Sequence, residues 1–267
     1  MRIAWLTDVH LDHVDALDVD RLSRQVAATR PDAVVLTGDI SVAPRLGEDL
    51  ERLLGAFRAP VYLVAGNHDY WGADVATVRT FLTRVRDVVP RLRWLGVEEP
   101  IVLDDERALV GVDGWADARL GDAERSPLRL ADYHHIADLK GDFDAAVGRA
   151  RALADADAVQ LGEQLERALR LRPHVYVATH FPPFAEAARY QGRITSGAFL
   201  PWVTSKAIGD ALLEQADRHP TRRITVLCGH MHHPAHVWMR PNLEVRTGAA
   251  EYGAPRVGDV IVLEGGD

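Results

Sequence analysis

Short apolar runs alternate with longer amphipathic segments along the first 90 residues, and this alternation restricts the fold more than any other feature of the sequence. The apolar runs have the length of buried strands and cover residues 2–7, 33–37 and 61–65. The amphipathic segments have helical spacing and cover residues 19–30, 45–57 and 75–88. Strand and helix repeated in this order predict an α/β protein whose first three strands pair in parallel.

The chain changes character after residue 90. Shorter strands over 93–95, 101–103 and 108–112 are separated by acidic or glycine turns, which favours antiparallel pairing in that part. A polar, irregular stretch then leads into a long helix over 143–171, and we interpret residues 114–171 as an insertion that covers a site. The remaining predicted elements are strands over 175–179 and 224–228, a helix over 205–218, and a strand meander over 235–239, 243–246 and 257–263. Since no linker or fixed repeat interrupts the chain, we expect one domain over residues 1–267.

The composition excludes several classes of protein. The 31 basic and 39 acidic side chains leave a net charge of −8, so a long nucleic acid is not an expected partner. The single cysteine, Cys228, cannot form an internal disulfide, and no segment is long and apolar enough to predict a membrane span. The first residues run into charged Asp8 rather than into the apolar core of a signal peptide. We therefore expect a cytoplasmic protein without membrane segments.

Polar side chains of the kinds that bind metals follow five of the predicted strands. They occur in Asp8-Val9-His10, Gly38-Asp39, Gly66-Asn67-His68-Asp69, at His180, and in Gly229-His230-Met231-His232. Taken singly, most have an ordinary explanation, because Asp-x-His and Gly-Asp are common in turns and His180 could be a core histidine. Since ligands bind at the carboxyl ends of strands in open α/β sheets, we expect the five segments to converge.

In this order, the five motifs resemble the signature of the calcineurin-like metallophosphoesterase superfamily. That signature reads Asp-x-His, Gly-Asp, Gly-Asn-His-Asp or Glu, a His, and Gly-His-x-His, and every part is present here. The resemblance extends from about residue 3 to residue 250 and leaves 114–171 outside any motif. It implies an α/β sandwich of four layers, in which two packed mixed β-sheets are flanked by helices and 114–171 forms an inserted lid.

The resemblance also implies a centre of two metal ions. One ion would be held by Asp8, His10, Asp39 and His232, and the other by Asp39, Asn67, His180 and His230, so that Asp39 bridges them. Two divalent ions about 3.5 to 4 Å apart can clamp a phosphoryl group and lower the pKa of a bridging water. Nitrogen and oxygen ligands suit first-row transition metals, and we expect two divalent or trivalent ions, Mn or Fe, with Zn as the alternative.

The resemblance assigns His68 a role beside the metals rather than among their ligands. It implies that this histidine protonates the leaving oxygen or stabilises the phosphoryl oxygens. In family branches with Gly-Asp-x-x-Asp-Arg, which include the protein Ser/Thr phosphatases, an Asp three residues after the bridging Asp orients this histidine. This chain has Val42 at that position, so it departs from those branches, and the partner of His68 stays open. Asp69 follows the motif and serves, in the simplest interpretation, to hold the loop.

Two further residues are candidates for substrate contacts. Tyr70, with its neighbour Trp71, follows the third motif directly and could stack on a base or an aromatic leaving group. Arg119 lies in the insertion, and its guanidinium could hold a phosphate. The insertion also contains Asp132-Tyr133-His134-His135, whose side chains could contact a polar substrate or simply belong to a solvated lid.

These observations favour a dinuclear metal-dependent hydrolase of phosphate esters, in which a metal-bound hydroxide attacks phosphorus. A small-molecule phosphodiester or a nucleotide is the preferred substrate, given the departure at Val42 and the net negative charge. The alternatives are a phosphomonoesterase or protein phosphatase, and a scaffold protein that keeps the fold without catalysis. A scaffold should show decayed ligand positions, whereas all seven are intact here. The oligomeric state stays open.

Overall fold

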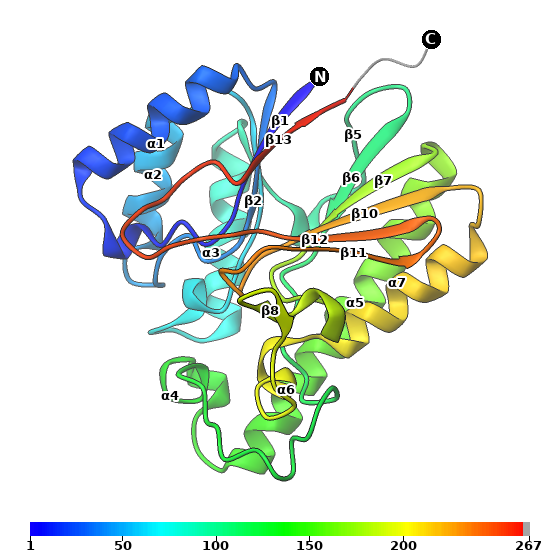
Figure 1. Ribbon diagram of the computed structural model, residues 1–267. Helices are drawn as coiled ribbons and strands as arrows, with labels where there is room; N and C mark the ends of the chain where they lie inside the picture. The colour runs from blue at the N-terminus through cyan, green and yellow to red at the C-terminus, as the bar shows by residue number, and fades with distance from the viewer. Residues whose placement is uncertain (264–267) are drawn as a thin grey trace.

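The computed structural model describes residues 1–263 and shows two mixed β-sheets packed face to face (Figure 1). The first sheet has the strand order β13-β1-β2-β3-β4 and the second β11-β12-β10-β7-β6-β5. The first sheet comprises β1 (Arg2–Leu6), β2 (Ala33–Thr37), β3 (Val61–Val64), β4 (Leu92–Trp94) and β13 (Asp259–Val262). The second comprises β5 (Ile101–Val102), β6 (Arg107–Gly111), β7 (His174–Ala178), β10 (Arg223–Cys228), β11 (Ala235–Arg240) and β12 (Leu243–Thr247).

Helices cover the outer face of each sheet, which confirms the expected sandwich (Figure 1). The first sheet is covered by α1 (Ala16–Thr29), α2 (Leu46–Ala56) and α3 (Val75–Val88). The second is covered by α5 (Phe143–Leu171) and α7 (Lys206–Arg218). Several helices begin at an aspartate whose side chain accepts a backbone N–H of the first turn, as Asp15 does for α1, Asp74 for α3 and Asp142 for α5.

The alternation of side chains along the strands divides the core into three apolar layers. In β1, Ala4 and Leu6 point outward to α1 and α2, whereas Ile3 and Trp5 point inward. The inward layer is completed from the second sheet by side chains that include Leu109, Tyr176, Ala178 and Leu227. Both faces of each central strand are therefore buried, which is why these strands read as continuous apolar runs.

The pairing of the first three strands is parallel, as predicted. Ile3 lies opposite Ala33, and Val34 opposite Val61. Parallel strands side by side end at one edge of the sheet, so the segments that follow β1, β2 and β3 lie close together. In the second sheet β7 and β10 are also parallel, with Val175 opposite Ile224.

The prediction of antiparallel pairing after residue 90 was correct for only one pair. β5 and β6 are antiparallel, but β4 extends the first sheet parallel to β3, and β6 pairs in parallel with β7. The predicted C-terminal meander was also wrong in its last strand. β11 and β12 form an antiparallel pair, whereas β13 crosses to the first sheet and lies antiparallel to β1, with Trp5 opposite Asp259. Strand length and turn residues do not determine which sheet a strand joins.

The segment that we predicted as an insertion consists of two structurally different parts. The C-terminal half of α5 packs Leu161, Leu165 and Leu169 on the second sheet and so belongs to an outer layer. Residues 114–142, which include α4 (Asp132–His135), pack with the start of α5 and with α6 (Leu200–Val203) in a separate apolar cluster around Trp202. This second part lies beyond the sheets at the foot of Figure 1.

The remaining regular elements are short. A two-stranded hairpin, β8 (Arg189–Tyr190) and β9 (Arg193–Ile194), stands apart from both sheets. The single turns of 3-10 helix are η1 (Leu11–His13), η2 (His68–Tyr70), η3 (Leu95–Val97), η4 (Ala137–Leu139) and η5 (Ala185–Ala187). Among residues 1–263, no helix combines the length and the apolar character that a membrane span requires.

Candidate metal centre

The segments after β1, β2, β3, β7 and β10 converge and bring the seven predicted ligands together. Asn67, His180 and His230 form one half of the cluster: Asn67 Oδ1 lies 3.0 Å from both His180 Nε2 and His230 Nδ1. Asp39 Oδ1 lies 3.3 Å from His180 Nε2. The side chains come from both sheets, so the packing of the sheets is what assembles this half.

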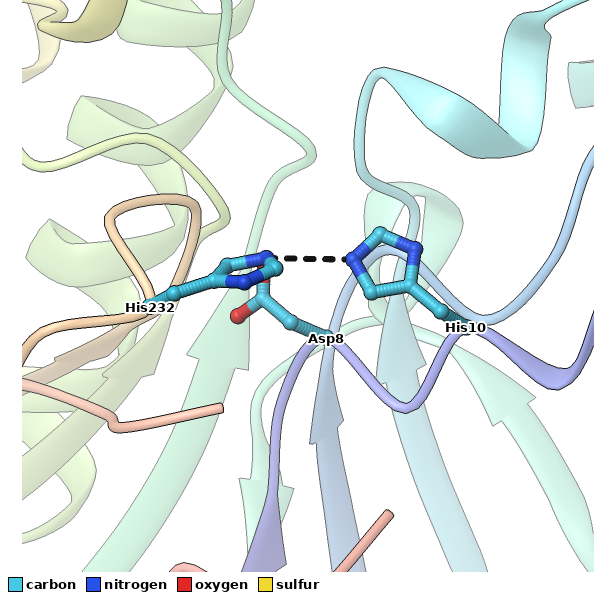
Figure 2. A group of neighbouring side chains, drawn as sticks. All are labelled: Asp8, His10 and His232. Carbon is cyan, nitrogen blue, oxygen red and sulfur yellow. Dashed lines mark hydrogen bonds and ion pairs between the residues drawn. The ribbon is translucent and has the colours of Figure 1, made fainter. Parts of the chain in front are cut away.

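The other half contains Asp8, His10 and His232. The Nε2 atoms of His10 and His232 lie 3.1 Å apart, and His232 Nε2 is 3.4 Å from Asp8 Oδ1. Figure 2 shows the two rings facing each other, with the carboxylate of Asp8 beside the ring of His232. The second oxygen of Asp39 lies 3.8 Å from His10 Nε2. Asp39 therefore presents one carboxylate oxygen to each half.

The backbone is bent sharply at most of these residues. Five of the seven ligands have positive φ although none is glycine: Asp8 at 50°, His10 at 41°, Asp39 at 53°, His230 at 67° and His232 at 54°. This conformation is costly for residues with a Cβ and is tolerated where the surroundings enforce it, often at functional sites. All five bends lie within four residues of the end of β1, β2 or β10.

Glycine is required at Gly229 by the close approach of another chain segment. A Cβ there would overlap Thr7 Oγ1 and Asp8 Oδ2. The backbone N–H of the next residue, His230, donates to both oxygens of Asp8, at 3.0 and 3.1 Å. The absence of a side chain at Gly229 therefore lets the loop after β10 hold the carboxylate of Asp8 in place.

Burial and the neighbouring carboxylates set different protonation states for the histidines of the centre. Burial lowers the pKa of His10 to about 4 and that of His230 to about 3, so both imidazoles are neutral near pH 7. Burial would raise the pKa of Asp39, but the neighbouring His180 and His68 outweigh it and hold that pKa well below its ordinary range. In His180, burial opposes the charged form, yet the attraction to Asp39 raises the pKa to about 10. The centre is thus a compact set of anionic carboxylates and imidazoles.

The residues present fit a pair of metal ions. Within each half, the carboxylate and imidazole atoms that could bind a metal lie within 4.8 Å of one another. One half comprises Asp8, His10 and His232, and the other Asp39, His180 and His230. His180 Nδ1 donates to the backbone oxygen of Thr37 at 2.8 Å, which points Nε2 at the centre, where a cation would take the place of the proton that Asp39 stabilises on this ring. Imidazole nitrogens and carboxylate oxygens that converge in this way are the arrangement that a cation between them would stabilise.

His68 lies at the edge of the cluster, where its ring stacks on Trp71 with centroids 3.6 Å apart and planes inclined by 24°. Its Nε2 is 4.0 Å from Asp39 Oδ2, and its backbone N–H donates to Asp39 Oδ1 at 2.9 Å. His68 Nδ1 is buried and has no hydrogen-bond partner among residues 1–263. In this chain an indole ring, and not a carboxylate, fixes the plane of the histidine.

Asp132, on α4, anchors this arrangement from the segment 114–142. Its Oδ1 accepts hydrogen bonds from Asn67 Nδ2 and from Trp71 Nε1, both at 2.8 Å, and its side chain is buried. The bond to Asn67 turns the amide so that its oxygen faces the metal cluster. The sequence placed Asp132 in a polar segment with open function, but no local signal connected it to residues more than 60 positions away.

Asp69 joins two of the ligand-bearing loops. It accepts the backbone N–H groups of Ile40, Ser41 and Gly66 at 2.8 to 2.9 Å, across the loops after β2 and β3. Burial, with Asp39 nearby, raises its pKa to about 8. Its contacts are those of the loop-holding residue that the sequence analysis described.

The two predicted substrate contacts are not presented to the centre. Tyr70 is fully buried, and its hydroxyl donates to Asp113 Oδ2 at 2.6 Å, so its ring is closed to a substrate. Arg119 pairs with Asp155 at 2.6 and 2.8 Å and with Asp117 at 3.2 Å, so its guanidinium is already occupied by carboxylates. The exposed aromatic ring at the centre is Tyr252, which lies 4.3 Å from His10 and 4.8 Å from His232 between ring centroids. Tyr252 was not predicted from the sequence, because it stands outside the shared motifs.

The chain is similar in structure to several solved proteins. Phosphopantetheinyl hydrolase (PptH) from Mycobacterium tuberculosis matches with a TM-score of 0.70 at 14% identity, over 94% of this chain and 89% of that one. A dimetal phosphatase from Danio rerio matches with a TM-score of 0.59 at 13% identity, over 97% and 88% of the two chains. GAP50, described as the anchor in the inner membrane complex of Plasmodium, matches with a TM-score of 0.53 at 12% identity, over 97% and 76%. At these identities the likeness establishes the fold.

The comparison with curated proteins finds no match to this chain. The family model of the calcineurin-like phosphoesterases, in contrast, matches residues 1–234, which include all seven residues predicted to hold the metals. The motifs, the two packed sheets and this match agree with one another. The chain belongs to the calcineurin-like phosphoesterase family.

Proposed function

We propose that this protein hydrolyses small phosphodiesters or nucleotides with a pair of metal ions. The observation that carries the proposal is the convergence of the seven predicted ligands, from five strand ends and two sheets, into one cluster. One ion would be held by Asp8, His10, Asp39 and His232, and the other by Asp39, Asn67, His180 and His230. When bound, such ions offset the charge of a phosphoryl group and lower the pKa of a coordinated water toward neutrality.

The chain's own residues would then hold the two ligand sets together and give a proton to the leaving oxygen. Asp39 presents an oxygen to each half of the cluster and would tie the two ligand sets together. His68, stacked on Trp71 at the edge of the cluster, is the group that we assign to protonating the leaving oxygen. The stack fixes the imidazole plane, which favours proton transfer along one direction.

The charge of the protein and the residue at position 42 support a small substrate over a phosphoprotein. With Val42 in place of an aspartate, His68 lacks the carboxylate that the resemblance associates with protein phosphatases. A phosphomonoesterase uses the same metals and is the second candidate. A scaffold without catalysis is disfavoured, because no ligand of the cluster has been replaced. Manganese or iron is our preferred metal, with zinc as the alternative, and the cytoplasm is the proposed compartment.

A metal-by-substrate matrix tests the proposal. Apo protein is reloaded with Mn, Fe, Co, Ni, Zn or Mg and assayed on bis-p-nitrophenyl phosphate and p-nitrophenyl phosphate. Asp39→Asn should abolish turnover, whereas Asp20→Asn, on the exposed face of α1, should leave it unchanged. Diester turnover supports the preferred substrate class, and monoester turnover alone supports the second candidate. Silence on both substrates with metal demonstrably bound would refute hydrolysis and favour a scaffold.

A further inference from the structure

A cleft of about 1000 Å³ lies beside the metal centre. Its wall is built by the β8–β9 hairpin, by the segment that follows it, and by the loop after β10. Its lining includes Tyr190, Arg193, Ile194, Phe199, His230 and Met231. Its volume is at the upper end of the range of about 300 to 1,000 Å³ that is typical of small-molecule sites.

Three large apolar side chains are exposed around this cleft. Tyr190 is 55% exposed, Ile194 47% and Phe199 43%, and all three belong to one short stretch of the chain. Isolated apolar residues on a surface need no explanation, but a group of them along one hollow marks a binding surface. The cleft therefore favours an apolar group as its occupant.

The hairpin is held in position rather than free. Arg189 donates to the backbone oxygens of Glu186 and Gly192 at 3.0 and 2.9 Å, which braces the turn. Ala188, directly before β8, is buried in an apolar cluster with Leu200 and Val203, against which Met231 packs. A two-stranded ribbon alone is marginally stable, so this apolar support is what keeps the exposed side chains in a defined place.

The cleft shares a residue with the metal centre. His230 lines the cleft, and its Nδ1 lies 3.0 Å from Asn67 Oδ1 within the cluster. The ring of Tyr190 also contacts that of His233, next to the ligand His232, with centroids 4.6 Å apart. A group seated in the cleft would therefore lie next to any phosphate held at the metals.

Arg193 adds a positive charge to the lining of the cleft. It lines the cleft, is exposed, and forms no ion pair with any residue from 1 to 263 in this structure. In a chain with a net charge of −8, such a guanidinium favours a ligand that carries negative charge as well as an apolar part.

We propose that this cleft binds the organic group of the substrate and that this group is large and apolar, an extended alkyl chain or an aromatic ring. The proposal rests on the proposed function, because it assigns the phosphate of the same ester to the metal centre. The concave shape and the shared His230 favour a small-molecule ester over a second protein chain as the occupant. Phe199 and Ile194 would supply most of the apolar contact.

Binding of non-hydrolysable phosphonates tests this inference without requiring turnover. Calorimetry on Mn²⁺-loaded protein compares methylphosphonate with octylphosphonate and phenylphosphonate. We expect at least one larger ligand to bind about tenfold or more tightly than methylphosphonate, because its apolar group leaves water. A stronger gain with octyl indicates an alkyl chain, and a stronger gain with phenyl indicates a ring.

The gain in affinity of the larger phosphonates over methylphosphonate should fall in Phe199→Ser and in Ile194→Ser, while the affinity for methylphosphonate itself stays the same. Val159→Ser, at a valine that is 65% exposed on α5 and outside the cleft, is the matched control and should keep the full gain. Equal affinity for all three phosphonates, or a gain that both cleft variants retain, overturns the inference. A wild-type dimer in sedimentation that Phe199→Ser dissociates also overturns it, because a second copy would then cover the patch. Hydrolysis is decided separately in the metal-by-substrate matrix, so a failure of this inference can be told apart from a failure of the proposed function.

Discussion

Replacing Asp132 should weaken metal binding from outside the ligand set. In Asp132→Leu, Asn67 Nδ2 and Trp71 Nε1 both lose the acceptor that now lies 2.8 Å from each. A buried donor left without a partner costs about 1 to 3 kcal/mol. Because Trp71 is only half-buried and water can replace part of its bond, we expect the free energy of unfolding to fall by about 2 to 4 kcal/mol.

The metal affinity should fall more specifically. Asn67 would no longer be turned toward the cluster, and loss of such an anchor behind a ligand typically lowers metal affinity about 10- to 100-fold. Trp71 would also be released, so His68 would lose the stack that sets its plane. The loss of kcat should therefore be larger for an ester with a poor leaving group than for a p-nitrophenyl ester, which needs less help from an acid.

Calorimetric titration of apo protein with Mn²⁺ measures the first effect, and kcat on the two esters measures the second. Asp132→Asn keeps an oxygen acceptor and should recover most of the affinity. Asp138→Leu is the matched control: Asp138 lies in the same segment but accepts from the backbone N–H of Val75 at 2.7 Å, away from the ligands. The reasoning is refuted if folded Asp132→Leu binds Mn²⁺ as wild type does, or if Asp138→Leu loses as much affinity.

Three further predictions concern the surroundings of the centre. Gly229→Ala should lower Mn²⁺ affinity at least about tenfold in the same titration, because the new methyl group displaces the carboxylate of Asp8. Unchanged affinity would contradict the close contact between Gly229 and Asp8 as the reason for glycine at this position. Arg79→Met should lower the free energy of unfolding, measured in urea, by about 3 to 5 kcal/mol. The guanidinium now lies 2.8 Å from Asp157 and 3.4 Å from Asp113, and the variant leaves both carboxylates buried without a cation. A loss below about 1 kcal/mol would show that these ion pairs are dispensable. Burial, with Arg223 and Arg107 nearby, lowers the pKa of His174 from 6.5 to about 4. The imidazole of His174 is therefore protonated in the unfolded chain at a higher pH than in the folded protein, so the free energy of unfolding falls as the pH drops from about 6.5 to 4. His174→Gln should remove about 1 to 2 kcal/mol of the loss between pH 7 and pH 5, and an identical pH profile in the variant would exclude His174 as its source.

Much of the metal centre could be predicted because its residues are recognisable locally. Each ligand stands directly after an apolar strand, in a short motif whose residue types already indicate metal chemistry, as in Gly229-His230-Met231-His232. The structure describes all seven in one cluster, and strands such as β2 and helices such as α3 and α5 have the predicted bounds. Helical and strand periodicities are properties of neighbouring residues, so one sequence suffices to detect them.

The contacts that tune the centre could not be predicted, because they join residues far apart in the chain. Tyr70 follows a ligand motif, yet its hydroxyl bonds to Asp113 in the core, and Arg119 pairs with Asp155 on α5. Neither outcome is encoded in the few residues around them. The polar types that could touch a substrate are equally suited to pair with one another once packing brings them together.

The sequence by itself determined the order of the main strands and helices, the candidate ligands and the class of chemistry, because these depend on residue type and local spacing. Only the tertiary structure decided that β13 joins the first sheet, that Trp71 takes the place of a carboxylate beside His68, and that Asp132 reaches Asn67 from 65 positions away. Those features depend on how two sheets and an inserted segment pack. Burial then makes each hydrogen bond costly to lose, which selects one arrangement among many that the local sequence allows.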